Sequence, residues 1–128
     1  GTFYGGQDEQ SFDGTPDAKG SIIGAEFLPD NPASNVQAFV TAFKAKYPSE
    51  TTVTEFEAGA YDALHVAVAA ATLGGATRDG VLQGFKTLKD VPSVVYGTIT
   101  FDPSTRRVAA PQLTPTILTN GTWAQVDG

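Results

Sequence analysis

The sequence has no cysteine and no methionine among its 128 residues, and His65 is its single histidine. The absence of cysteine excludes a disulfide framework and a thiolate metal site. Charged residues are also scarce, at 17%, and 8 Lys and Arg face 14 Asp and Glu, which gives a formal net charge of -6. A surface of that sign repels phosphate backbones, so we expect no nucleic-acid partner.

Long apolar runs are absent too. The longest Ala-rich run, Val66 to Leu73, is far shorter than a membrane span. The chain opens Gly-Thr-Phe-Tyr, without an initiator methionine or a signal sequence, so we expect a fragment of a longer protein. Hydrophobic residues make up 41%, enough for one core, and 14 Gly with 8 Pro indicate many turns between short elements.

The first third of the chain predicts two strands and the start of a helix. Residues 1–6 predict the end of a strand with a Gly-Gly turn, and the apolar run 21–28 predicts a buried strand. The polar residues 7–19 between them predict a loop. Asn31 is the expected N-cap of the next helix, with Pro32 at its first position.

Three helices are predicted in the middle of the chain. The first carries one apolar stripe at helical spacing, made of Val36, Phe39, Val40, Phe43 and Tyr47. The second opens with the capping box of Thr54 and Glu57 and runs to Leu73, and its many alanines predict a largely buried helix. Thr77 is the expected cap of the third, whose apolar residues are Val81, Leu82, Phe85 and Leu88.

Strands are predicted after Pro92. Residues 94–101 are β-branched and aromatic and predict one strand, and 102–105 predict a turn. Residues 113–119 and 122–126 flank Asn120-Gly121, which predicts a hairpin. Pro115 within the first of these predicts an edge strand, because proline cannot donate to a ladder.

No group of residues predicts catalysis. Nucleophilic catalysis needs an activated side chain beside a base, and a lone mid-helix histidine such as His65 is more often a packed or half-exposed residue. The acidic stretch of Gln7, Asp8 and Glu9 with Asp13 does not match the spacing of a calcium loop. We therefore expect no enzyme, no metal and no cofactor.

The loop after the first strand is the one place that favours ligand binding. In open α/β sheets, ligands lie beyond the carboxyl ends of strands, and Tyr4, Gly6, Gln7 and Asp8 fall there. Glycine lets a ligand approach the backbone, while Gln7 and Asp8 offer an amide and a carboxylate. The alternative is an ordinary polar surface loop, which composition alone favours.

Several strings resemble, in the correct order, the C-terminal part of type I periplasmic binding proteins of the leucine/isoleucine/valine-binding family. They are residues 3–8 (FYGGQD), 20–29 (GSIIGAEFLP), 38–47 (AFVTAFKAKY), 60–63 (AYDA) and 96–102 (YGTITFD). The matches run in order over essentially the whole chain, and the ordered set is fairly specific.

The resemblance implies the α/β class and part of a two-lobe type I periplasmic binding protein fold, in the order strand, strand, three helices, C-terminal strands. It assigns residues 1–29 to the end of lobe 2 with a crossing strand and 30–92 to a helical segment of lobe 1. Residues 93–128 become C-terminal strands and a hairpin that return to lobe 2.

The functional implication is the substrate-binding component of an ABC importer for branched-chain amino acids or related small molecules. Such a protein closes on its ligand in an interlobe cleft and hands it to a membrane permease. The implied location is extracytoplasmic, either periplasmic or at the cell surface. The alternative is a ligand-sensing domain of a receptor or an amide-responsive regulator.

The resemblance also implies the site residues Tyr4, Gly6, Gln7 and Asp8. Where the family commonly has an acid that meets the ligand ammonium group, this sequence has Gln7, followed by Asp8. Either Asp8 takes that role or the ligand is not a free amino acid. A fragment of this fold leaves sheet edges and helix faces uncovered, so we expect it to self-associate or to exchange strands with another copy.

Overall fold

The structure is a computed structural model that describes residues 4–5 and 18–126. The order of its elements, strands followed by three helices and then strands, confirms the predicted α/β class. The chain divides into two compact units: Gly1–Glu26 with Gln112–Gly128, and Phe27–Pro111. The expected boundaries at residues 29 and 92 assign segments to lobes, and that assignment stays a prediction. In the structure, residues 93–111 belong to the same compact unit as the helices.

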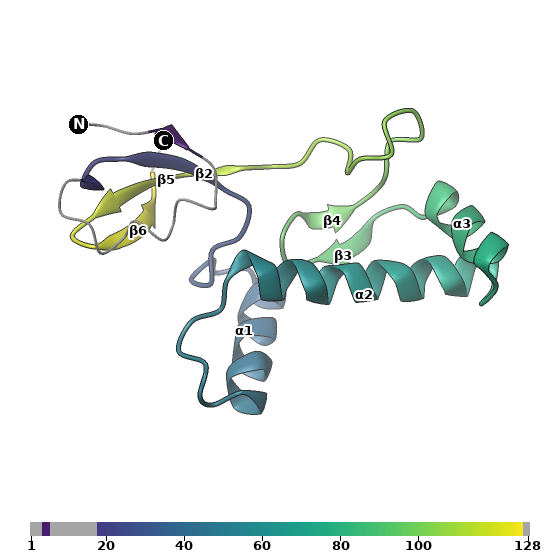
Figure 1. Ribbon diagram of the computed structural model, residues 1–128, viewed down its shortest axis with the longest axis horizontal. Helices are drawn as coiled ribbons and strands as arrows, with labels where there is room; N and C mark the ends of the chain where they lie inside the picture. Colours follow the sequence, from purple (N-terminus) through teal and green to yellow (C-terminus); the bar gives the residue numbers. More distant parts are fainter. Residues whose placement is uncertain (1–3, 6–17, 127–128) are drawn as a thin grey trace. The chain divides into compact units, whose positions relative to one another are not determined.

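The first unit holds a four-stranded sheet in the order β1-β2-β5-β6 (Figure 1). Its strands are β1 (Tyr4–Gly5), β2 (Ile22–Ala25), β5 (Thr114–Thr119) and β6 (Thr122–Gln125). β1 runs parallel to β2, and the other pairs are antiparallel. The predicted hairpin is confirmed: Asn120 and Gly121 have φ of 53° and 79°, the left-handed values that a two-residue turn requires.

The prediction that Pro115 marks an edge strand is wrong, because β5 is paired on both sides. The Pro115 carbonyl accepts a hydrogen bond from the Val126 N–H at 2.9 Å, so the backbone of this residue points toward the β6 side. The β5–β6 ladder ends at Thr116 and Gln125. Pro115 lies one position beyond this ladder, opposite Val126, so the N–H that it lacks would have made only a terminal bond toward β6.

The second unit is built around three helices, α1 (Ser34–Lys46), α2 (Glu55–Gly74) and α3 (Arg78–Thr87). The predicted caps Thr54 and Thr77 are confirmed, and Glu57 completes the capping box. The hydrogen bond from the Thr54 side chain is the main reason that the pKa of Glu57 is lowered. None of the described helices is long and apolar enough to span a membrane.

The predicted start of α1 is wrong by two residues, since its N-cap is Ala33. The Asn31 side chain accepts a hydrogen bond from the Ala33 N–H at 3.0 Å, which makes a turn before the helix. Pro32 accordingly precedes the helix and is not its first residue.

The structure also corrects the strand predicted over residues 94–101. Only its central part, β4 (Gly97–Ile99), is a strand, and it pairs antiparallel with β3 (Val91–Ser93), which precedes the predicted range; the residues between them form a turn. The turn predicted at 102–105 is confirmed: the Asp102 carboxylate accepts from the N–H groups of Ser104 and Thr105 at 2.7 and 2.8 Å. These bonds, led by the one from the Ser104 hydroxyl, lower the pKa of Asp102 to about 2.

α2 carries two apolar clusters, one toward each end. The first cluster joins it to α1 and the second joins it to α3 and the β3–β4 pair; α2 contributes Ala58 to the first and Val66 and Ala70 to the second. The opposite face of α2 is exposed, with Phe56, Leu64 and Val68 at 71%, 64% and 57% of their full accessibility. The predicted burial of this helix is therefore correct for one face only.

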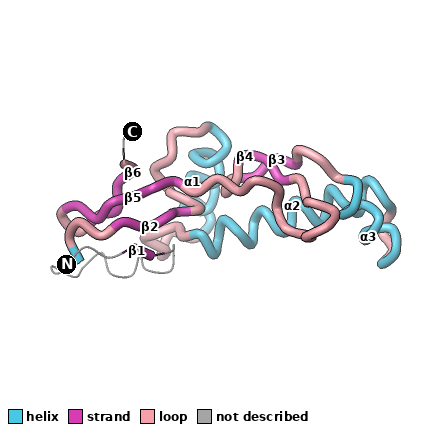
Figure 2. Tube along the Cα trace, turned by 90° about the horizontal axis from the view of Figure 1, so that it is seen from above, coloured by secondary structure: helices cyan, strands magenta, loops and turns pink. Residues whose placement is uncertain are grey.

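Glycine permits the close approach of α2 and α3, which lie side by side at one end of the unit (Figure 2). A Cβ on Gly84 would overlap the carbonyl group of Ala70, with the carbonyl carbon at 2.6 Å. Gly74 and Gly80 meet in the same way, so that a Cβ on either would overlap the backbone of the other. These contacts are backbone to backbone, and neither helix can relieve them by moving a side chain.

Gly84→Ala should therefore destabilise the helical unit by about 3 kcal/mol, near the upper end for overpacking. The matched control is Gly59→Ala within α2, where a Cβ meets nothing within 4 Å. That change should stabilise the protein by about 0.5–1 kcal/mol through helix propensity. Urea unfolding followed by helical circular dichroism measures both, and equal effects of the two substitutions would contradict the assigned contact.

Candidate functional site

The predicted ligand loop begins at one edge of the four-stranded sheet. Because β1 and β2 are parallel, their carboxyl ends at Gly5 and Ala25 lie at the same edge, and β5 begins there at Thr114. Tyr4 lies in β1, whereas Gly6, Gln7 and Asp8 lie outside the described residues. Their assignment to a ligand stays a prediction, made for the end of a sheet where ligands commonly bind.

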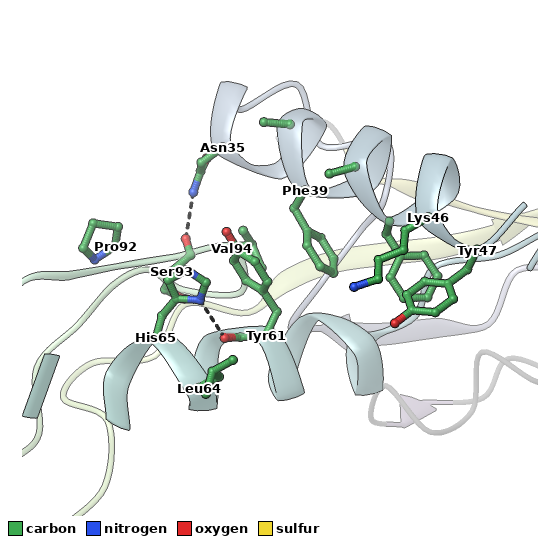
Figure 3. A pocket seen from close by; sticks show the side chains of 13 residues that line it. Asn35, Phe39, Lys46, Tyr47, Tyr61, Leu64, His65, Pro92, Ser93 and Val94 are labelled. Carbon is green, nitrogen blue, oxygen red and sulfur yellow. Dashed lines mark hydrogen bonds between the residues drawn. The ribbon is translucent and has the colours of Figure 1, made fainter. Parts of the chain in front are cut away.

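A second candidate is an open groove of about 780 Å³, formed entirely within the helical unit (Figure 3). α1 forms one wall, α2 the other, and the end of β3 closes part of the floor. Its thirteen lining residues are Asn35, Ala38, Phe39, Ala42, Phe43, Lys46, Tyr47, Tyr61, Leu64, His65, Pro92, Ser93 and Val94.

A continuous row of aromatic rings runs along this groove. Ring centroids are 4.1 Å apart between His65 and Tyr61 and 4.7 Å between Tyr61 and Phe39, and the row continues at 6.1 Å to Phe43 and 4.9 Å to Tyr47. The row crosses from α2 to α1 between Tyr61 and Phe39. Phe39 is buried, while Tyr47 and Tyr61 are 46% and 40% exposed, so the row joins the core to the groove surface.

The floor of the groove is fixed by the buried carboxylate of Asp62. It accepts hydrogen bonds from the Ser93 hydroxyl at 2.5 Å and from the N–H groups of Val94 and Val95 at 2.9 and 3.1 Å. Ser93 Oγ in turn accepts from the Tyr96 N–H at 2.7 Å. Asn35 on α1 donates to the Ser93 carbonyl at 2.8 Å, so both walls and the floor are joined at Ser93.

His65 is exposed at one end of the ring row. Its Nδ1 lies 2.9 Å from the Tyr61 carbonyl oxygen. A carbonyl can only accept, so Nδ1 carries the proton, and Nε2 is an acceptor when the ring is neutral. This contact lies within one helix turn and gives His65 no catalytic partner. Across the described residues no group of three His, Cys, Asp or Glu side chains could hold a metal ion.

Sequence reasoning did not find the groove as a site. It placed Phe39, Phe43 and Tyr47 in the apolar stripe of the first predicted helix and did not single out Lys46. A signal was nevertheless present, because Phe43, Lys46 and Tyr47 at spacings of three and four lie on the same side of α1. The other wall comes from residues that only the tertiary structure brings near.

Comparison with known proteins gives a family match over most of the chain. The family profile described as periplasmic binding protein matches residues 1–116. No curated protein sequence gives a significant match.

Solved structures give the same result at the level of the fold. A branched-chain amino-acid ABC transporter protein from Rhodospirillum rubrum has a TM-score of 0.76 at 26% identity, over 96% of this chain and 36% of that one. A leucine-binding protein from Thermotoga maritima has a TM-score of 0.77 at 21% identity, over 99% of this chain and 37% of that one. An extracellular ligand-binding receptor from Rhodopseudomonas palustris has a TM-score of 0.79 at 18% identity, over 99% of this chain and 41% of that one. The chain thus spans a little over a third of the length of these proteins.

Asp62→Ala should lower the free energy of unfolding by about 3 kcal/mol, because three buried donors lose a charged acceptor. The control Asp30→Ala, at an exposed position, should change it by less than about 0.5 kcal/mol. Helical circular dichroism in urea compares the two.

Hydrogen exchange gives a more local measurement of the same contact. The milder substitution Ser93→Ala should speed exchange at the Val95 and Tyr96 amides, which bond to the lost hydroxyl. Unchanged exchange there would contradict the role of this network.

Proposed function

The chain belongs to the periplasmic binding protein family, and from that membership we propose that it is part of the substrate-binding component of an ABC importer. The observation that carries this proposal is the family match over residues 1–116. The likeness to transporter binding proteins over 96–99% of the chain supports it. The ligand would be a branched-chain amino acid or a related small molecule, bound without chemical change.

We place the ligand at the loop that follows β1, with Tyr4, Gly6, Gln7 and Asp8 as the contacting residues. The parallel pairing of β1 with β2 supports this, since both strands end at the same side of the sheet, where ligands commonly bind in open α/β folds. In this proposal Asp8 pairs with the ammonium group of the ligand and Gln7 hydrogen-bonds a polar group beside it. In this proposal the ligand is held in an interlobe cleft, as the resemblance to the family implies.

The proposed partner is the membrane permease of the importer, and the proposed location is outside the cytoplasm, in the periplasm or at the cell surface. The second candidate function is a ligand-sensing domain of a receptor. Similarity to proteins from Rhodopseudomonas palustris that are named extracellular ligand-binding receptors favours this alternative. Both functions use the same closure on a ligand and differ in what the closed form contacts.

We also propose that the 128-residue chain self-associates through the outer face of α2. Phe56, Leu64 and Val68 are 57–71% exposed along this helix, and Ala60, Ala63, Ala67 and Ala71 beside them allow close approach. This face carries no acidic side chain beyond the first turn, so the net charge of the chain does not oppose pairing there. Strand exchange through the four-stranded sheet is the alternative arrangement.

The ligand assignment is tested by calorimetry in a two-lobed binding protein that carries this segment, with leucine as the first ligand. Asp8→Ala should weaken binding at least tenfold, because it removes the charge partner of a buried ammonium group. Gln7→Ala should have a smaller effect. The control Asp79→Ala lies on the exposed first turn of α3 and should change nothing. If Asp8→Ala and Gln7→Ala both leave the affinity unchanged, the site assignment is wrong.

Self-association is tested by light scattering on the 128-residue chain. The expected mass exceeds the 13.3 kDa of a single copy. The double substitution Leu64→Glu and Val68→Glu should return it to 13.3 kDa, whereas Thr51→Glu with Thr52→Glu adds the same charge before α2 and should leave the mass unchanged. A persistent dimer in the first variant would favour strand exchange, and a monomeric unsubstituted chain would contradict both.

A further inference from the structure

The groove between α1 and α2 has a chemistry that the proposed function does not use. It lies wholly within the Phe27–Pro111 unit, whereas the loop after β1 belongs to the other unit. Its volume of about 780 Å³ is within the range of small-molecule sites. We propose that this groove is a binding site for a small aromatic carboxylate.

The charge of the lining selects an anion. Among the thirteen lining residues there is no Asp or Glu, although acidic residues outnumber basic ones 14 to 8 in the chain. Lys46 provides the one fixed charge. Figure 3 shows its amino group directed into the space between the rings of Phe39 and Tyr47.

Lys46 is available to a ligand carboxylate. Its Nζ lies 5.8 Å from the centroid of the Tyr47 ring, a cation–π contact that holds the side chain toward the groove. Within the described part of the chain no carboxylate pairs with it. A ligand carboxylate would add an ion pair there without displacing a partner.

The aromatic row selects the rest of the ligand. Phe43 and Tyr47 on one wall and Tyr61 on the other present ring surfaces to the groove, and a ligand ring can stack against them or meet them edge to face. An aliphatic carboxylate would gain the ion pair but not these ring contacts. An aromatic cation would meet Lys46 as a like charge.

The test is a nuclear magnetic resonance titration of the 128-residue chain with benzoate at low ionic strength. Benzoate should shift the signals of Phe43, Lys46, Tyr47 and Tyr61 and saturate with a dissociation constant on the order of millimolar, as expected for so small a ligand in an open groove. Benzamide, isovalerate and benzylammonium are the comparison probes, and each should bind at least about threefold more weakly.

Lys46→Gln should weaken benzoate binding about two- to fivefold, the range for an exposed ion pair. The matched control is Lys44→Gln, which removes the same charge from the same helix turn at a residue that does not line the groove. Equal effects of the two variants would reduce the proposal to a general charge effect and overturn it. Equal binding of benzamide or isovalerate, or no shift in the groove signals, would overturn it as well.

Discussion

Asp62 places a carboxylate on the buried face of α2, where an apolar side chain would continue the stripe of Ala58, Val66 and Ala70. A buried charge costs several kcal/mol unless hydrogen bonds replace its water. The turn after β3 supplies those bonds from one hydroxyl and two N–H groups. The two apolar clusters of the helical unit lie on either side of this contact, with α2 common to both, so it sets how helix and turn meet.

The same contact shapes the groove. Ser93 and Val94 belong to the floor because the Asp62 carboxylate accepts from the Ser93 hydroxyl and the Val94 N–H, and Asn35 then attaches the start of α1 to the Ser93 carbonyl. Once α1 is fixed there, its apolar stripe brings Phe39 within stacking distance of Tyr61. The exposed end of the stripe, with Phe43, Lys46 and Tyr47, becomes the outer wall. A structural carboxylate thus positions the aromatic row without itself lining the groove.

Local patterns in the sequence predicted what local forces determine. The capping box at Thr54, the cap at Thr77 and the Asn120-Gly121 turn are satisfied by neighbours in the chain, and the structure has all three. The strand predicted over residues 94–101 begins only at Gly97, because the N–H groups of Val94 and Val95 bond to Asp62, 32 and 33 positions earlier. Pro115 misled because it lies at the end of the β5–β6 ladder, where a missing donor costs only a terminal bond and a strand can still pair on both sides. The prediction that α2 is largely buried was wrong for one face. Many alanines permit close packing, but they do not supply an element that packs against that face.

For the site, resemblance and geometry contribute different information. The family match gives the binding of a small solute as the expected activity, and the parallel pair of β1 and β2 shows only that both strands end at the same side of the sheet. The resemblance cannot fix the ligand, because the loop has Gln7 where an acid is common and Asp8 one position later. The groove could not be predicted from either source, since α1, α2 and β3 meet there only through tertiary contacts. Its chemistry is nevertheless readable from the lining itself: one cation, a row of rings and no acid favour an aromatic anion, whatever the ligand of the interlobe cleft.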